Sequence, residues 1–226
     1  MVVRDYDSLM SNVIIAIPTY YGGQLIGNCI QSILKNVTNP EIMVYKNDVG
    51  WLKACNKMIQ DTQDDIILLN DDTLVLTDIA YEMHKLAYSD KSIGVVGAKA
   101  LAPNGETIIN YGITIAVDGN SAHRFFGQPK DSVGVEKQKA VEGSCMYIKR
   151  EVIDSIGLFD EVYGMGYRAE VDYCFRAREA GYKIVSCPTA EYTHLVSQTA
   201  GRLGIENDTH KIFMDAWGSS LRLGRI

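Results

Sequence analysis

Two adjacent carboxylates follow an apolar run in the first third of the chain. Residues 64–69 end in four aliphatic side chains, a pattern typical of a short buried strand, and Asn70, Asp71 and Asp72 end that run abruptly. In an open α/β sheet, ligands bind beyond the carboxyl ends of the strands. Mg²⁺ takes one or two carboxylates together with phosphate oxygens of a substrate. The segment is therefore a candidate cation site, although the same residues are also ordinary turn residues.

Alternating strand and helix patterns must position these carboxylates. Strand, helix, strand in this rhythm predicts an α/β fold with a mostly parallel central sheet flanked by helices. The predicted strands of the first half are residues 13–17, 41–45, 64–69 and 93–98, and the predicted helices are residues 25–34, 50–60 and 78–88, the last capped by Thr77 or Asp78.

The second half of the chain is less regular. Asn104-Gly105 predicts a turn between two extended segments, and residues 119–134 have the composition of a long surface loop. There are no internal repeats or linkers, so we expect one domain over residues 1–226. The remaining predicted elements are strands at 141–148, 183–187 and 191–194 and helices at 151–156, 169–180 and 205–217.

The composition excludes several classes of protein. Hydrophobic residues make up 46% and charged residues 22% of the 226, as in soluble globular proteins, and a net charge of −6 does not favour nucleic acid as a partner. Five scattered cysteines without a CxxC pair argue against a disulfide framework. No run approaches the ~18 apolar residues of a membrane span, and the acidic first residues do not suit a signal peptide. We expect a cytoplasmic protein.

Four motifs in order resemble those of the family 2 glycosyltransferases, which have the GT-A fold. The resemblance implies a single, Rossmann-like GT-A domain, with a nucleotide-sugar-binding half at 1–98 and an acceptor-binding and catalytic half at 99–226. The motifs are Ile15-Ala16-Ile17-Pro18-Thr19-Tyr20, Gly50-Trp51-Leu52-Lys53-Ala54-Cys55-Asn56, Leu69-Asn70-Asp71-Asp72-Thr73, and a block from Glu142-Gly143-Ser144 through Gly157-Leu158-Phe159-Asp160 to Glu170-Val171-Asp172 and Gly181-Tyr182.

The resemblance implies roles for three residues around a metal. Asp72 would ligate Mn²⁺ or Mg²⁺ bridging the two phosphates of a nucleoside-diphosphate sugar, and Asp71 would lie near the ribose or the sugar. The metal would neutralise the charge that develops on the departing diphosphate. His194 stands where the family often has a histidine near the metal and diphosphate; the alternative is a hydrogen-bonded structural histidine.

The resemblance also implies a nucleotide pocket. Pro18, Thr19 and Tyr20 would hold the base and ribose, by stacking on Tyr20 or a hydrogen bond from Thr19. Lys53 and Asn56 are three residues apart on one predicted helix, so both could face the nucleotide; Lys53 is equally well explained as a solvated lysine.

An inverting sugar transfer needs a carboxylate to take the proton of the acceptor hydroxyl. The family usually has a Glu-Asp pair at the start of the 169–180 helix, and here the pair is Ala169-Glu170. The resemblance therefore makes Glu170 the candidate base, with the helix N-terminus expected to keep it ionised and limit any rise in its pKa. Asp172 is expected to pair with Arg176 at i, i+4.

A second departure follows the 41–45 strand. The family commonly has an Asp-Asn-x-Ser segment there that reads the nucleobase, whereas this chain continues almost directly into the next helix. Asp48 or Asn47 would take over that role, which leaves UDP, dTDP and GDP donors open.

The acceptor side is marked by aromatic and polar residues. Tyr111, His123, Arg124, Phe125 and Phe126 lie in the region where the family has acceptor-contacting loops. Aromatic faces beside polar groups suit a sugar ring, so the expected acceptor is a glycan or another hydroxyl compound. An exposed aromatic pair would equally suit a homodimer contact.

These observations favour a metal-dependent, inverting hexosyltransferase. One alternative is a sugar-phosphate nucleotidyltransferase, which needs a basic, glycine-rich phosphate loop after the first strand; residues 18–23 contain no Lys or Arg. The other is a degenerate GT-A module that binds a nucleotide-sugar without turnover, which the Ala169-Glu170 pair and the shortened second strand keep open.

Overall fold

Aliphatic runs form the centre of the sheet in the computed structural model, which describes residues 13–20, 22–46, 48–195 and 209–226. β1 (Val13–Thr19) and β3 (Asp65–Leu69) are buried along their whole length, as expected for parallel strands that helices cover on both faces. The main sheet has the order β2-β1-β3-β10-β5-β11-β4, with β6 paired to β5 and β9 paired to β11. The other strands are β2 (Glu41–Lys46), β4 (Thr73–Val75), β5 (Ile93–Leu101), β6 (Ile108–Asn110), β9 (Glu136–Lys137), β10 (Cys145–Ile148) and β11 (Lys183–His194), while β7 (Ile113–Ile115) and β8 (Ser121–His123) form a separate hairpin.

The predicted fold class, a mostly parallel sheet flanked by helices, is confirmed. β2, β1, β3, β5 and β11 run in one direction. The predicted strand at 141–148 starts only at Cys145 and inserts antiparallel between β3 and β5, with Cys145 opposite Leu69. Because antiparallel strands run past each other, the residues just before Cys145 lie beside the residues just after Leu69.

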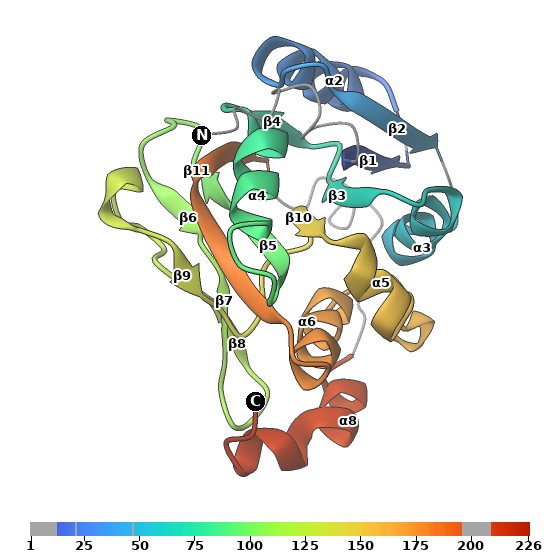
Figure 1. Cartoon of the computed structure of the whole chain (residues 1–226), viewed down its shortest axis with the longest axis vertical. Helices are drawn as coiled ribbons and strands as arrows, with labels where there is room; N and C mark the ends of the chain where they lie inside the picture. Colours follow the sequence, from blue (N-terminus) through green and yellow to red (C-terminus); the bar gives the residue numbers. More distant parts are fainter. Residues whose placement is uncertain (1–12, 21, 47, 196–208) are drawn as a thin grey trace.

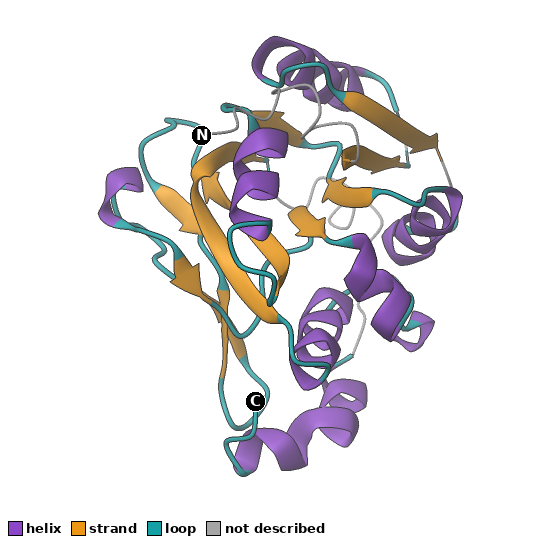
Figure 2. Ribbon diagram, viewed as in Figure 1, coloured by secondary structure: helices purple, strands orange, loops and turns teal. Residues whose placement is uncertain are grey.

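Helices cover the sheet on both faces (Figure 2). Along β3, Ile67 and Leu69 pack with the core cluster that contains α2 and α4, whereas Ile66 and Leu68 pack with the cluster that contains α3, α5, α6 and α8. This alternation is the two-residue period of a strand. The helices are α2 (Gln24–Asn36), α3 (Trp51–Asp61), α4 (Ile79–Ala87), α5 (Arg150–Ile156), α6 (Ala169–Glu179) and α8 (His210–Arg222), with 3₁₀ turns at Lys130–Ser132 and Glu161–Tyr163.

The predicted elements of the first half lie close to the observed ones, although β4 (Thr73–Val75) is not among them, and the second half differs more. Asp78 caps α4 by accepting from the backbone N–H of Tyr81 at 3.1 Å. The expected loop at 119–134 contains β8 and a 3₁₀ turn, and the two predicted extended pieces near the end of the chain are one long strand, β11, with an irregular register between Ser186 and Glu191. The predicted helix at 205–217 runs from His210 to Arg222 within the described residues; positions 205–208 lie outside them.

Two further expectations concern cysteines and membranes. All five cysteines are buried and none forms a disulfide. Among the described residues, no helix combines the length and the apolar character needed to cross a bilayer.

Candidate active site at the carboxyl end of β3

Backbone hydrogen bonds fix the acidic segment after β3. The N–H of Asn70 donates to the carbonyl of Ser144 at 2.9 Å, and the N–H of Leu195 donates to the carbonyl of Asp72 at 3.0 Å. The segment is therefore held between the start of β10 and the end of β11. Asp72 is buried and Asp71 is half-buried.

β11 brings His194 to Asp72. β4 pairs antiparallel with β11, with His194 opposite Thr73, so the last residue of β11 lies next to the second aspartate. Nε2 of His194 is 3.1 Å from Oδ1 of Asp72, and Nδ1 is 3.5 Å from Oε1 of Glu142. Both ring nitrogens are buried, and neither makes an in-line hydrogen bond. Burial lowers the pKa of His194, but the two carboxylates outweigh it and raise the pKa to about 9.

The donor set of this cluster fits a divalent cation. A buried imidazole without an in-line partner beside a carboxylate is the kind of pair that a metal between them would satisfy. Carboxylates are ligands that suit Mn²⁺ and Mg²⁺, and imidazole is a common ligand of first-row transition metals. Within the described residues, no group of three or more His, Cys, Asp or Glu side chains has the arrangement of a complete metal centre. Asp72 and His194 would thus supply only part of a coordination sphere, with the rest left to a substrate or water.

The first loop reaches the same place. Oγ1 of Thr19 donates to Oδ2 of Asp71 at 2.5 Å and accepts from the N–H of Gly22 at 3.0 Å. Burial raises the pKa of Asp71, the hydrogen bond from Thr19 opposes this rise, and the charge of Asp72 adds to it. The structure therefore brings the predicted nucleotide loop and the predicted metal motif together.

The other predicted nucleotide residues fall into two groups. Pro18 is buried and Tyr20 half-buried beside Thr19, and the register Thr19 with Lys46 places the exposed Asp48 just beyond the same edge of the sheet. Asn47 lies outside the described residues.

The α3 residues are not brought to this edge as a pair. Lys53 is exposed, whereas Asn56 is buried and bonded to Phe159 through both its amide nitrogen and its oxygen, at 2.9 and 3.0 Å, with a further contact to Glu161 at 3.3 Å. The amide of Asn56 thus connects α3 to the segment before the second 3₁₀ turn.

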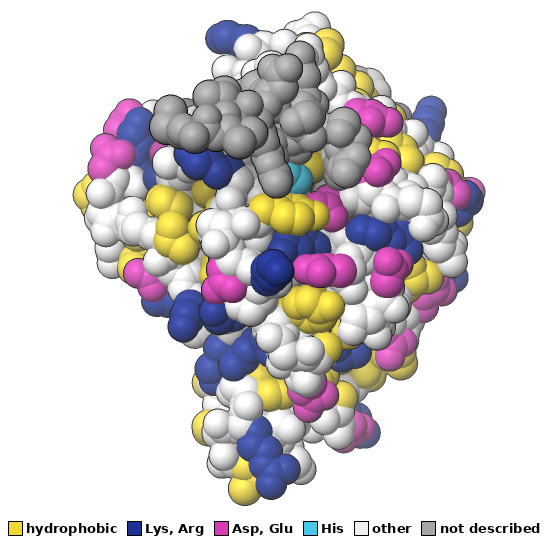
Figure 3. Space-filling model, in the orientation of Figure 1, with side chains coloured by type: hydrophobic (Ala, Val, Ile, Leu, Met, Phe, Trp, Pro, Cys, Tyr) yellow, Lys and Arg dark blue, Asp and Glu magenta, His cyan; other side chains and the backbone are white. Residues whose placement is uncertain are grey.

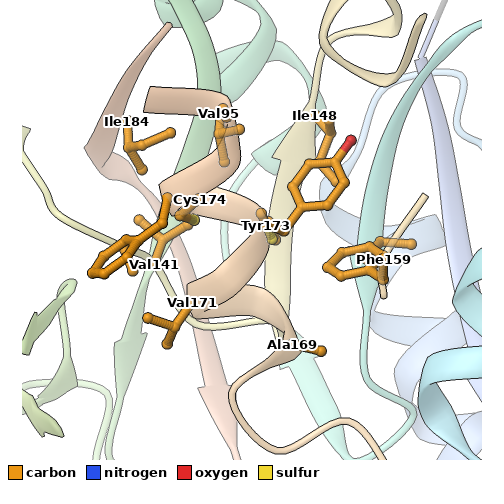
Figure 4. Close-up of a cluster of buried hydrophobic side chains, with 14 of the residues drawn as sticks. Val95, Val141, Ile148, Phe159, Ala169, Val171, Tyr173, Cys174 and Ile184 are labelled. Carbon is orange, nitrogen blue, oxygen red and sulfur yellow. The ribbon is translucent and has the colours of Figure 1, made fainter. Parts of the chain in front are cut away.

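Glu170 lies in the first turn of α6. The helix is anchored by a cluster of apolar side chains that includes Val171, Tyr173 and Cys174 (Figure 4). A Cβ placed on Gly143 would come within 3.5 Å of the Glu170 Cβ, so the carboxylate side chain starts next to the Glu142-Gly143 segment. Burial raises the pKa of Glu170 to about 7, with the helix backbone and Arg168 opposing the rise and Glu142 adding to it. Burial thus outweighs the helix N-terminus, contrary to the expectation from sequence.

The structure adds two residues that the sequence reasoning did not select. Glu142 reaches His194 because β10 is antiparallel to β3, and Trp51 donates from Nε1 to Oδ1 of Asn70 at 2.8 Å. The Trp51 ring also fills the space beside Gly143 and Gly166, where a Cβ would approach it to 2.9 and 2.8 Å. The signal for both was present, since each stands inside a quoted motif, but their contacts depend on strand direction.

Other predicted residues have structural contacts. Asp172 pairs with Arg176 at 2.8 Å, as expected, and also accepts from the Trp217 indole at 2.8 Å. Tyr111 is buried, with its hydroxyl donating to backbone carbonyls of Gly134 and Ser186 at 2.6 and 2.9 Å.

The other predicted acceptor-side residues lie on or beyond β8. Arg124 stacks over the Phe125 ring at 4.8 Å, His123 is exposed, and the Phe126 side chain is 71% exposed. Figure 3 shows acidic and basic side chains on the face in view, with several basic ones close together toward its lower left.

Solved structures share this architecture. The structure of GalNAc-T7 with UDP, GalNAc and Mn²⁺ matches 81% of this chain and 43% of its own, with a TM-score of 0.64 and 12% identity. The mannosyltransferase PcManGT from Pyrobaculum calidifontis, in complex with GDP-Man and Mn²⁺, matches 83% of this chain and 58% of its own, with a TM-score of 0.57 and 14% identity. The chain has the GT-A fold of glycosyltransferases. At these identities the likeness shows the fold.

Sequence relatives agree with this GT-A assignment. An uncharacterized protein of Sinorhizobium fredii is 32% identical over 155 residues, 65% of this chain. The O-antigen biosynthesis protein RfbC of Myxococcus xanthus is 26% identical over 45% of the chain, and an N-acetylglucosaminyl-diphospho-decaprenol L-rhamnosyltransferase of Mycobacterium tuberculosis is 37% identical over 27%. The aligned regions span 17%, 8% and 20% of these relatives, and no family model matches the chain. The chain thus has the GT-A fold, and two of these relatives carry names from sugar transfer or O-antigen biosynthesis.

Proposed function

We propose that this chain transfers a sugar, by inversion, from a nucleoside-diphosphate sugar to an acceptor hydroxyl, with Mn²⁺ or Mg²⁺ bound at Asp72 and His194. The observation that carries the proposal is the buried His194 ring, which lies 3.1 Å from Asp72 without an in-line hydrogen bond at the carboxyl end of β3. Solved neighbours with Mn²⁺ and a nucleotide or nucleotide-sugar support this kind of donor and cofactor.

Each side chain has a distinct task in this proposal. The bound metal would supply positive charge that neutralises the departing diphosphate. Asp72 and His194 would hold it, and Asp71, kept in place by Thr19, would face the donor's ribose or sugar. Pro18, Tyr20 and Asp48, grouped around the same edge, would contact the nucleoside.

Glu170 would act as the general base. Efficient base catalysis at neutral pH needs a pKa near 7, because the group must be ionised and still basic enough to take a proton. Burial raises the pKa of Glu170 to about 7, which matches that requirement. Glu170 would thus serve the acceptor hydroxyl from the first turn of α6, while Asp72 and His194 would hold the cation at the carboxyl end of β3.

The donor test measures thermal unfolding with Mn²⁺ alone, with UDP, dTDP or GDP alone, and with Mn²⁺ combined with each nucleotide. The proposal expects one nucleotide to stabilise the protein only when the metal is present, since a bridging ion couples the two ligands. Equal stabilisation with and without Mn²⁺ would contradict the metal bridge.

The catalytic test follows release of the nucleoside diphosphate from the matching sugar donors. Glu170→Gln should lower turnover by about 10²–10⁴-fold while metal-dependent nucleotide binding is retained. Wild-type turnover should rise through pH about 7 as Glu170 ionises, by roughly tenfold per unit below that pH. Glu179→Gln, which changes an exposed acid at the other end of α6, is the matched control. Binding with no turnover in the wild type would instead indicate a binding module.

A further inference from the structure

Arg168, immediately before α6, has an unusual backbone. Its φ is +71°, in the left-handed region, which is strained for an L-residue with a bulky side chain. The surrounding structure must therefore hold it there. Its carbonyl already accepts the first helical hydrogen bond, from the N–H of Asp172 at 2.9 Å, so the conformation of Arg168 sets where α6 begins.

Among the described residues, the Arg168 side chain makes its hydrogen bonds and ring contact with the β7–β8 turn and α8. Nη1 donates to the carbonyl of Gly119 at 2.6 Å, Nη2 is 3.2 Å from Nδ1 of His210, and the guanidinium lies 5.3 Å from the centre of the Phe213 ring. Gly119 belongs to the turn between β7 and β8, and the other two belong to α8. Figure 1 shows α8 beside α6 and the tip of that hairpin.

The junction is tightly packed. A Cβ on Gly119 would come within 2.4 Å of Sδ of Met214, and Gly119 has a φ of +81°. The Trp217 indole of α8 donates to Asp172 one turn along α6. The β7–β8 turn and α8 thus pack together at the start of α6. The Arg168 guanidinium contacts both of them.

We propose that Arg168 is a positioning residue for Glu170, and that α8 and the Gly119 turn set the base through it. This inference rests on the proposed function, because it takes Glu170 as the base. The geometric reason is that Glu170 lies two residues beyond Arg168, so a shift in the helix start moves the carboxylate directly. Catalytic geometry tolerates little displacement: a 1 Å shift costs on the order of 100-fold in rate.

The experiment compares Arg168→Gln, Arg168→Lys and Arg168→Gly in the full chain. Turnover of the sugar donor should fall by about 10–100-fold in the Gln and Gly variants, with the donor KM within about twofold of wild type. Arg168→Lys keeps the charge but not the planar fork, so it should recover only part of the loss. Glycine adopts the left-handed backbone without strain but lacks the side-chain contacts of Arg168. Wild-type turnover in Arg168→Gly would therefore overturn the proposal.

A second readout does not depend on turnover. ¹³C NMR titration of the side-chain carboxyls, with the Glu170 signal identified from its absence in Glu170→Gln, should show an altered Glu170 pKa in Arg168→Lys as well as in Arg168→Gln. Displacement of the carboxylate changes its burial even where the positive charge is kept. A Glu170 titration in Arg168→Lys identical to wild type would overturn the proposal. If the wild type has no turnover, the proposed function fails while this titration still tests the coupling.

Two further variants distinguish loss of the contacts around Arg168 from a general loss of stability in α8. Gly119→Ala disturbs the junction without changing the Arg168 side chain, and it should lower turnover and alter the Glu170 titration as the Arg168 variants do. Lys211→Gln removes a charge from the exposed side of α8, where it pairs with Asp215, and should leave turnover and titration as in wild type. Equal effects from Lys211→Gln and Arg168→Gln would overturn the proposal.

Discussion

The two ends of β3 carry the same kinds of side chain in opposite states. At the amino end, the Asp65 carboxylate accepts from the Tyr147 hydroxyl, from the Tyr88 hydroxyl at 2.9 Å and from the backbone N–H of Arg150 at 2.7 Å. His84 completes this network with a 2.9 Å contact to Tyr147. At the carboxyl end, Asp72 also has a histidine beside it, but the ring nitrogens of that histidine make no in-line hydrogen bond.

The difference separates structural from functional polar groups. A buried polar network with every member hydrogen-bonded holds elements together and has no capacity left for a ligand. A buried imidazole without an in-line partner costs stability, so its retention suggests a group that binds there. Asp65 joins β3, α4, β10 and the start of α5, whereas Asp72 and His194 end two strands that open toward a common edge.

The histidines of the two ends also differ in charge. Burial lowers the pKa of His84, which keeps it neutral among tyrosines and Lys149. His194 lies between two carboxylates that raise its pKa to about 9 against the effect of burial. In the absence of a cation, the proton on His194 therefore offsets part of the negative charge that Asp72 and Glu142 bring to the carboxyl end.

The largest effects are expected when one aspartate at each end of β3 is replaced by asparagine. Asp72→Asn should abolish the coupling between Mn²⁺ and nucleotide in thermal unfolding and reduce donor turnover by at least about 100-fold, because it removes a proposed metal ligand. Asp65→Asn should keep the coupling but lower the free energy of unfolding by about 1–3 kcal/mol, because an amide nitrogen replaces one of the two carboxylate oxygens that accept from these donors. That loss corresponds to roughly 2–4 °C in Tm per kcal/mol for a chain of this size.

Each variant serves as the control of the other. If Asp65→Asn lost the metal coupling as completely as Asp72→Asn, the division between a structural and a functional end would be wrong. Retention of full coupling in Asp72→Asn would remove Asp72 from the metal site.

A smaller effect is expected from Glu142→Gln. Glu142 lies 3.5 Å from Nδ1 of His194, on the side of the ring away from Asp72, where an acceptor would fix the tautomer that leaves Nε2 for a metal. Loss of such a partner typically weakens metal affinity by about 10–100-fold. Isothermal titration of Mn²⁺ in the presence of the stabilising nucleotide measures this change.

The control for Glu142→Gln is Glu151→Gln, which alters an exposed acid beside Lys149 at the amino end. Metal affinity should be unchanged in that variant. Equal affinities in wild type and Glu142→Gln would show that His194 does not need this carboxylate.

Local sequence signals determine which helices and strands could be predicted. Elements such as β1, α3 and α4 are predictable because a continuous apolar run, helical periodicity and an N-cap are local signals. The short β7–β8 hairpin was missed because its β8 strand, Ser121–His123, is exposed on every residue and so has no apolar pattern. β11 was split in two because its bulge and Pro188 interrupt the run at 187–190.

The site was predicted in part for the same reason. Asp71 and Asp72 follow an apolar strand, a local pattern, and the structure places Thr19 and His194 beside them. Glu142 and Trp51 could not be selected, since their contacts arise from the antiparallel insertion of β10 and from packing across α3. Asp65 shows the converse: by sequence it is the neighbour of Asp64 at a strand end, and only its three donors identify it as structural.

The smallest expected effect is the pH dependence of the stability that His84 contributes at the amino end of β3. His84 has a lower pKa in the folded protein than in the unfolded chain, so protonation favours unfolding. The stability that neutral His84 contributes is present above the unfolded pKa of about 6.5 and is lost as the pH falls below it. At pH 7, His84→Gln should cost about 1 kcal/mol or less, because the Gln amide can still contact Tyr147. Thermal unfolding at pH 7, 6 and 5 should then show the gap between wild type and variant closing or reversing with acid. A constant gap over this range would mean that His84 has the same pKa in the folded and unfolded states. The hydrogen-bonded network at the amino end would then not disfavour its protonation.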